Sequence, residues 1–201
     1  MPSLLDLLTV VSVLTINWDE IIELRTLMRD MLFEYWLRES LFSFNWWFLL
    51  VSTIIFFIIW LIVLDKKRII EISVVGLFIG TIAFVLDTVG VTLVLWSYPY
   101  KIIPIVPPIL EIHKFHLPIV YMINYQFLNK WKSYLLGTTI SAFIFSFIFE
   151  PLTVWLGIYE IYHWKYIYSF PIYIAMGVLV RWGMIKVKEM EKKNKKTLPY
   201  N

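Results

Sequence analysis

Ionisable side chains interrupt some of the most apolar parts of this sequence, where an isolated charge is costly. Asp87 lies within the apolar segment 73–96, and Glu150 precedes Pro151 in a second apolar segment. A central Asp costs about 2.5 to 3.5 kcal/mol on membrane-insertion scales, so we expect both carboxyls to face the protein interior. A buried acid of this kind can bind a cation or transfer a proton, and a structural hydrogen bond or ion pair is the alternative. Both residues are therefore candidate ligand-binding groups.

A second group of candidates lies within the sequence EIHKFH. Glu111 falls in the first turn of an expected helix, where the helix dipole favours an anion. His113 and His116 are three residues apart and so share a helix face. Two histidines with carboxylates can bind a divalent metal, but His-x-x-His without a third local ligand is a weak metal motif. We therefore expect the histidines to hydrogen-bond to tyrosines, and we assign no metal site.

Arg181 is the candidate on the last apolar segment, four residues before that segment ends at Ile185. Its guanidinium either extends to the cytoplasmic surface or pairs with Asp87 across the bundle. The absence of cysteine excludes disulfides, thiolate metal ligands and cysteine nucleophiles. The sequence also has no glycine-rich phosphate loop, nucleophile elbow or HExxH motif, so it indicates no particular cofactor.

The composition is that of a membrane protein. Of the 201 residues, 60% are hydrophobic and 16% are charged, whereas soluble domains have about 45–50% and about 25%. A membrane-spanning helix needs roughly 20 apolar residues, which leaves room for about five or six spans and no separate soluble domain. We expect an all-α, polytopic helical membrane bundle with the lipid bilayer as its surroundings.

Aromatic and basic residues predict how the spans are oriented. Trp and Tyr favour the membrane interfaces, and Lys and Arg favour the cytoplasm. Basic clusters follow the first, third and fifth apolar segments, so all three clusters fall on one side. We therefore predict five spans, with the N-terminal segment outside and the C-terminus in the cytoplasm. The predicted spans are 44–64, about 73–96, about 107–127, about 133–156 and about 167–185.

Two segments flank the predicted bundle of residues 44–186. Residues 1–43 form an N-terminal interfacial segment, in which 18–42 has the period of an amphipathic helix. No basic region precedes the first apolar run, so we expect this segment to be retained, and whether residues 2–16 enter the membrane stays open. Residues 187–201 form a basic tail, which is typical of a cytoplasmic anchor that faces anionic lipid rather than nucleic acid.

A proline-rich stretch separates the second and third predicted spans. Prolines lack a backbone donor and disfavour helix in the preceding residue, so 97–108 is expected to be an ordered outer loop or a re-entrant segment. If the third helix begins at Pro108, His116 lies roughly 12 Å deep at 1.5 Å per residue. That depth is close to the levels expected for Asp87 and Glu150. The sequence thus predicts that these groups converge on one site beneath a proline-rich lid.

Several short motifs together resemble an uncharacterised family of small multi-span membrane proteins from spore-forming Gram-positive bacteria. These motifs include FNWWF, DKKRIIE, EIHKFHLPIVYM and WKYIYSFPIYI, and the resemblance covers about residues 40–185. It implies a protein of the bacterial cell membrane and no established activity. A fainter similarity is to membrane-bound carotenoid cyclases, which also place an Asp, a Trp-x-Tyr and a Pro-Glu element in neighbouring spans. The acidic pair of those enzymes is absent here, since Pro108 is followed by Ile109, Leu110 and the single Glu111.

Three functions remain open on these observations. In the first, the polar residues bind or transport a small ligand or ion at an outward-facing intramembrane cluster. In the second, the chain is an enzyme that modifies an isoprenoid or lipid by means of a carboxylic acid and a histidine. In the third, the polar cluster only holds the helices of a structural or accessory membrane protein together. Whether the chain is an enzyme, and its oligomeric state, are left open.

Overall fold

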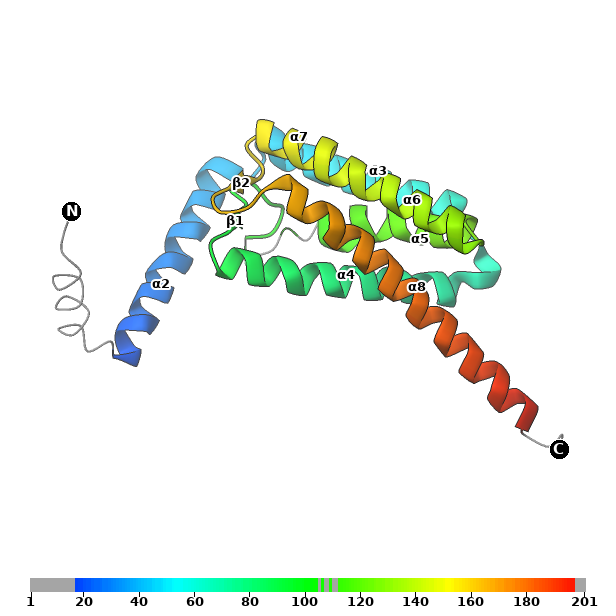
Figure 1. Cartoon of the computed structure of the whole chain (residues 1–201). Helices are drawn as coiled ribbons and strands as arrows, with labels where there is room; N and C mark the ends of the chain where they lie inside the picture. The colour runs from blue at the N-terminus through cyan, green and yellow to red at the C-terminus, as the bar shows by residue number, and fades with distance from the viewer. Residues whose placement is uncertain (1–16, 105, 107–108, 110–111, 198–201) are drawn as a thin grey trace.

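The computed structural model describes residues 17–104, 106, 109 and 112–197, and for residues 113, 114 and 194–197 it describes the backbone alone. The described part is almost entirely helical (Figure 1). Its α-helices are α2 (Trp18–Tyr35), α3 (Phe44–Val63), α4 (Ile69–Thr92), α5 (Leu117–Phe127), α6 (Trp131–Ile144), α7 (Glu150–Trp155) and α8 (Tyr166–Thr197). Short π-helical turns cover Trp36–Ser40, Ile112–His116 and Phe145–Phe149, a 3-10 turn covers Lys66–Arg68, and the strands are β1 (Trp96–Ser97) and β2 (Glu160–Ile161).

Four helical stretches are long and apolar enough to cross a membrane. The π turn Phe145–Phe149 joins α6 to α7, so the two helices form one continuous rod (Figure 1). The four stretches are Phe44–Val63, Lys66–Thr92, Trp131–Trp155 and Tyr166–Lys193. They make the chain an integral membrane protein, and they confirm the first and fourth predicted spans closely. The fifth begins where predicted, but its helix continues past residue 185 to Lys193. The second begins and ends a few residues earlier than predicted.

The middle predicted span differs most from the structure. Ile109 is described and is not helical, so the expected helix start at Pro108 is wrong. The helical turns described begin at Ile112, and together with α5 they end at Phe127, which leaves them too short to be one of the four long stretches. The sequence explains the difference, because prolines disfavour helix in the residue before them, and the described Ile109 is buried without being helical.

Helix α5 is the centre of the bundle. Seven of its eleven residues are buried, and α5 packs against α3, α4 and α6. Tyr121 and Tyr134 are fully buried, and their hydroxyls donate to the α8 carbonyls of Tyr173 and Gly177 at 2.8 and 2.9 Å. In contrast, α3 buries only Leu49 of its twenty residues. The bundle therefore has a short, enclosed helix surrounded by longer helices that present apolar side chains outward.

One end of the bundle is formed by aromatic loops. Strands β1 and β2 pair antiparallel, with Trp96 opposite Ile161, and so join the α4–α5 loop to the α7–α8 loop. The loop after β1 is held from the other side, since Trp36 and Ser40 donate to the carbonyl of Lys101 at 2.9 and 3.3 Å. The indole of Trp46 reaches the next carbonyl, at Ile102. The described part of the expected outer loop is thus fixed by backbone and side-chain hydrogen bonds.

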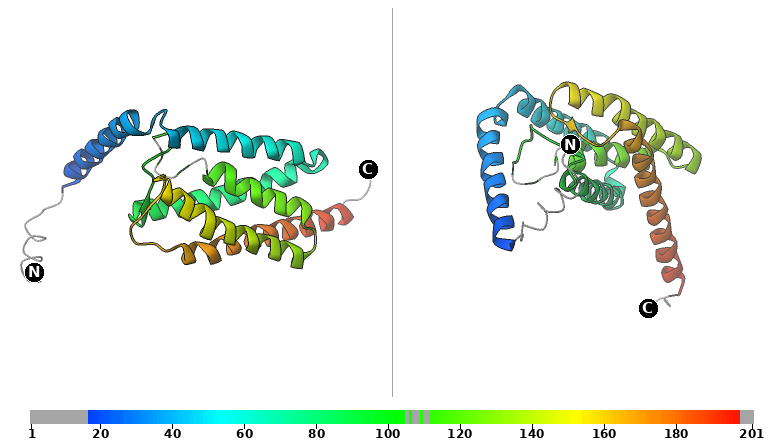
Figure 2. Two further views of the ribbon diagram at one scale, coloured as in Figure 1. Left: turned by 90° about the horizontal axis from the view of Figure 1, so that it is seen from above. Right: turned by 60° about the vertical axis from the view of Figure 1, so that its left-hand side comes forward.

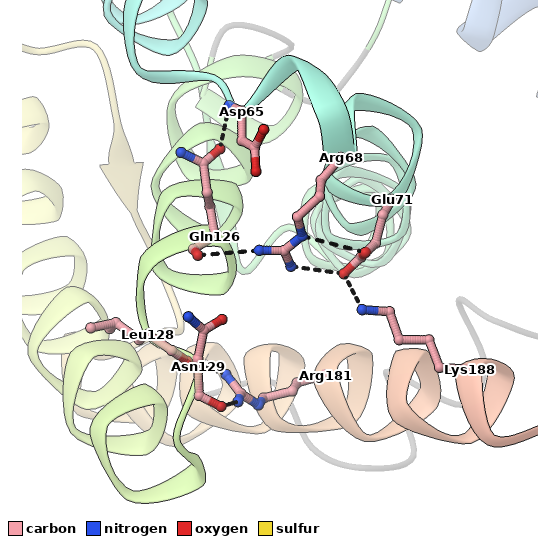
Figure 3. A network of polar contacts seen from close by, with 8 residues as sticks. All are labelled: Asp65, Arg68, Glu71, Gln126, Leu128, Asn129, Arg181 and Lys188. Carbon is pink, nitrogen blue, oxygen red and sulfur yellow. Dashed lines mark hydrogen bonds and ion pairs between the residues drawn. The ribbon is translucent and has the colours of Figure 1, made fainter. Parts of the chain in front are cut away.

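The opposite end, called the basic end below, carries the clusters 66–68 and 130–132. It ties α5 to the α3–α4 turn (Figure 3). The side chain of Gln126 donates to the Val63 carbonyl at 2.6 Å and accepts from the backbone N–H of Asp65 at 3.0 Å. Nearby, Glu71 lies 2.9 Å from Arg68 and 2.6 Å from Lys188, which links α4 to α8. The segment between β1 and Gln126 therefore runs from one end of the bundle to the other.

Helix α2 projects away from the bundle at the aromatic end, and α8 extends past the bundle at the basic end (Figures 1 and 2). The helix predicted from the period of 18–42 is confirmed for Trp18–Tyr35, and α2 has no buried residue. Leu24, Met28 and Met31 are all more than half exposed. Its placement along a membrane surface stays a prediction.

Close packing of α8 on α5 and α6 yields a stability prediction. A Cβ at Gly177 would lie 2.6 Å from Cε1 of Tyr121 and 2.7 Å from Cγ2 of Thr138, so Gly177→Ala must displace buried atoms. We expect it to lower the free energy of unfolding by about 1 to 3 kcal/mol. Gly183 in the same helix has open space around its Cβ position, so Gly183→Ala should be neutral or stabilising. Thermal unfolding in detergent measures both, and equal effects would contradict the prediction.

Candidate ligand-binding cavity

A cavity of about 310 Å³ lies between α3, α4, the α6–α7 rod and α8, near the aromatic end. Aliphatic and aromatic side chains form most of its wall, for example Phe48, Leu86 and Ile172. Asp87, His116 and Glu150 also line it. The structure therefore brings three of the six candidate residues to one cavity, although their role in binding stays a prediction.

Asp87 is 3% exposed and is held by two donors from the turn that follows its own helix. Its Oδ1 accepts from the indole Nε1 of Trp96 at 2.7 Å and from the hydroxyl of Tyr98 at 2.6 Å. An indole N–H can only donate, so Oδ1 of Asp87 is the acceptor in its bond with Trp96. Burial, followed by the charge of Asp87, raises the pKa of Tyr98 well above 10, so this hydroxyl keeps its proton.

The turn after α4 explains how Trp96 reaches Asp87. The N–H of Leu95 bonds to the carbonyl of Gly90, and the N–H of Val94 bonds to that of Val91, which is a Schellman ending. Val94 takes a φ of 53°, an unfavourable conformation for a β-branched residue. The reversed chain lays the Trp96 ring against Gly90, where a Cβ would overlap the ring. A glycine is therefore needed one turn above Asp87.

Glu150 lies on the opposite rod and receives two hydroxyl donors from α8. Its Oε1 accepts from Tyr173 at 2.8 Å and its Oε2 from Ser169 at 3.1 Å. Ser169 in turn accepts from the indole of Trp164 at 3.0 Å. Pro151 lacks the N–H of a regular helical bond, and the π turn immediately before it widens the rod there. The local distortion at Glu-Pro therefore coincides with a cavity.

His116 closes the wall from the π turn that precedes α5. It is 9% exposed, its Nε2 lies 3.1 Å from the Ser52 hydroxyl of α3, and its ring centre lies 4.5 Å from that of Phe56. Serine rather than tyrosine is thus the hydrogen-bonding partner described for this histidine. His116 faces the protein interior, as the argument from depth requires.

The remaining candidates lie elsewhere or outside the description. Glu111 is outside the described residues, and the structure describes the backbone of His113 but not its side chain. Arg181 does not pair with Asp87, because it lies at the basic end, where it donates to the carbonyls of Leu128 and Asn129 at 2.6 and 2.5 Å (Figure 3). Within the described part of the chain, no group of three or more His, Asp or Glu is placed to hold a metal ion.

Sequence reasoning missed the aromatic residues that donate to Asp87 or pack beside its donors. Trp96 and Tyr98 have the residue types expected at a membrane interface, yet both donate to Asp87. Tyr159 stacks on Tyr98 at a ring-centre distance of 5.3 Å, and its pKa is raised by burial and then by the charge of Glu150. The signal that points to them is the Trp-x-Tyr motif nine residues after Asp87, since a tight reversal there returns the rings to the carboxyl.

Comparison of the chain with known protein families, with curated proteins and with solved structures finds no match. The cavity is therefore the feature from which a function can be inferred.

Proposed function

We propose that this chain is a multi-pass protein of the bacterial cell membrane that binds a small, largely apolar molecule carrying one polar group. The observation that carries the proposal is that Asp87, His116 and Glu150 line a single cavity whose other walls are mostly aliphatic and aromatic. Ligand pockets commonly have this character, with an apolar wall and a few convergent polar groups. Carboxyls at membrane depth are costly, and function is a frequent reason for their presence.

The cavity wall favours an organic ligand over a bare metal or alkali ion. Hard cations need several oxygen ligands that replace their hydration shell. Here each carboxyl is engaged by indole or hydroxyl donors, and the surfaces between Asp87 and Glu150 are those of residues such as Leu86, Phe145 and Met176. An apolar body with one polar end matches this wall. Such a molecule can enter from the bilayer or from the aromatic end, where residues 97–104 would act as the lid.

The proposal includes five crossings of the membrane, with the basic end in the cytoplasm and α2 outside. Support for the fifth crossing comes from the segment between β1 and Gln126, which passes from the aromatic end to the basic end. Support for the orientation comes from Arg68 and Lys130, which directly precede α4 and α6, and from Lys188 of α8, which pairs with Glu71 at the same end. The resemblance to small membrane proteins of spore-forming bacteria agrees with this placement.

A second candidate function, an enzyme acting on an isoprenoid or lipid, is favoured by one specific observation. Two carboxyls and a histidine meet in the same apolar cavity, where a carboxylic acid can be kept neutral by burial. Such an acid would give its proton to an alkene carbon and leave a carboxylate beside a carbocation. Loss of a proton from the neighbouring carbon to the carboxylate would then restore the acid and a shifted alkene.

Filling the cavity tests the binding proposal. Ala83 is 3% exposed and lines the cavity from α4, so Ala83→Met places three further heavy atoms in the space. We expect the variant to lose at least about nine-tenths of the small molecule that co-purifies with the wild-type protein, because an occupied cavity cannot accept a ligand. Native mass spectrometry of protein released from mild detergent measures the bound fraction.

Ala175→Met is the matched control, because Ala175 is exposed on α8 and does not line the cavity. It should keep the wild-type bound fraction. Thermal unfolding of both variants separates a blocked cavity from a damaged fold. A wild-type protein without bound molecules, or equal occupancy in both variants, would contradict the proposal.

A further inference from the structure

Acids outnumber bases among the described residues that line the cavity. Among its described lining residues, Asp87 and Glu150 are acids, His116 is the single base, and no lysine or arginine is present. Two basic side chains of the neighbouring helix α8 have their partners at the basic end of the bundle. Arg181 bonds to carbonyls at the other end, and Lys188 pairs with Glu71 there.

The donors to the two carboxyls leave them as acceptors. The indole of Trp96 and the hydroxyl of Tyr98 donate to Asp87. The hydroxyls of Ser169 and Tyr173 donate to Glu150. These bonds orient both carboxyls, and a cation placed between them would favour the charged form of each, so the acids can attract a cationic ligand from two walls.

Aromatic rings line the same region as the acids. Trp96 lies 5.0 Å from Trp164 between ring centres, at an interplanar angle of 67°, and Tyr98 stacks on Tyr159 at 5.3 Å. All four side chains line the cavity, together with Tyr173. Faces of Trp and Tyr attract organic cations, and groups of such rings are a known means of recognising quaternary ammonium groups. Acids and aromatic rings are thus combined in one space.

We propose that the cavity selects a lipophilic organic cation, in which a quaternary or protonated amine lies between Asp87, Glu150 and the four rings, and an apolar group fills the aliphatic part. This inference rests on the proposed binding function and names the class of ligand. A neutral molecule of the same shape gains the apolar contacts but not the attraction of two carboxylates and the ring faces.

A matched pair of small probes tests the inference. Benzyltrimethylammonium and neopentylbenzene have the same shape, because a neutral carbon replaces the charged nitrogen. Isothermal titration calorimetry on the full chain in nanodiscs, corrected with empty nanodiscs, gives both affinities. We expect the cation to bind at least about tenfold more tightly, since a desolvated cation gains from both charge and ring contacts.

Variants of the acids identify the origin of the preference. Glu150→Gln keeps the shape and can still accept from Tyr173, and we expect it to weaken cation binding about tenfold while the neutral probe changes less than about twofold. Asp87→Asn keeps an acceptor for Trp96, and we expect it too to weaken cation binding about tenfold with little change for the neutral probe. Glu160→Gln is the control, because Glu160 is exposed on β2 outside the cavity.

Each other outcome has a defined meaning. Equal binding of the two probes overturns the cation inference and leaves the apolar cavity as a binding site. Equal weakening of both probes in Glu150→Gln also overturns it, since the charge would then not be the cause. If neither probe binds to the folded wild-type protein, both the cation inference and the proposed binding function fail.

Discussion

Replacement of Arg181 by methionine is expected to lower the free energy of unfolding by about 2 to 4 kcal/mol, which is large for one residue of a membrane bundle. Arg181 is 6% exposed, and its guanidinium donates to the carbonyls of Leu128 and Asn129, just after the end of α5 (Figure 3). The same guanidinium lies 4.2 Å above the ring of Tyr134. The carbonyls just after α5 have no helical partner, so losing this donor leaves the half-buried Leu128 carbonyl without its bond and removes the buried contact with Tyr134.

Chemical unfolding in mixed micelles measures the change, and Arg38→Met is the matched control. Arg38 also contacts a partner, Glu34 at 2.6 Å, but both side chains are more than half exposed. Such surface pairs contribute about 0 to 1 kcal/mol, so the control should be close to neutral. If both variants lost the same stability, Arg181 would not anchor α5.

The second large effect is an all-or-none difference in labelling from outside the cell. The chain has no native cysteine, so single variants report their own position. Glu160→Cys is exposed on β2 at the aromatic end, and Lys192→Cys is exposed near the end of α8. We expect a membrane-impermeant maleimide to label Glu160→Cys in intact cells and to label Lys192→Cys only after lysis, because basic clusters remain in the cytoplasm.

Labelling after lysis shows that each cysteine is reachable, which is the internal control for both variants. Reversed labelling would place the basic end outside and would overturn the proposed orientation. Labelling of both cysteines in intact cells would contradict an odd number of crossings between β2 and the end of α8.

Most of the bundle could be predicted from the sequence because each membrane span needs about 20 consecutive, mostly apolar residues. The limits of α3 and of the α6–α7 rod follow from apolar length and from the aromatic and basic residues beside them. The approach of Asp87, His116 and Glu150 to one cavity follows from their cost in lipid and from equal depth along their helices. These arguments need only the distance along each helix.

The rest depends on contacts between distant parts of the chain. Depth along a helix does not tell which way a side chain faces, so Arg181 could not be assigned to the end of α5 rather than to Asp87. The donors to Asp87 come from a turn whose reversal depends on Val94 in a strained conformation. The start of the middle helix could not be predicted either, because proline marks both the first turn of a helix and irregular backbone.

The unequal burial of the helices has a consequence for how this sequence can change over evolutionary time. In α3, only Leu49 is buried, so the exposed apolar positions can drift among Leu, Ile, Val and Phe while lipid still accepts the surface. In α5, seven of eleven side chains are buried, and even an exchange of similar size must fit its neighbours. Sequence similarity between descendants is therefore expected to persist longest in α5, and to be lost first at the exposed positions of α3, the helix that looks most like a membrane span.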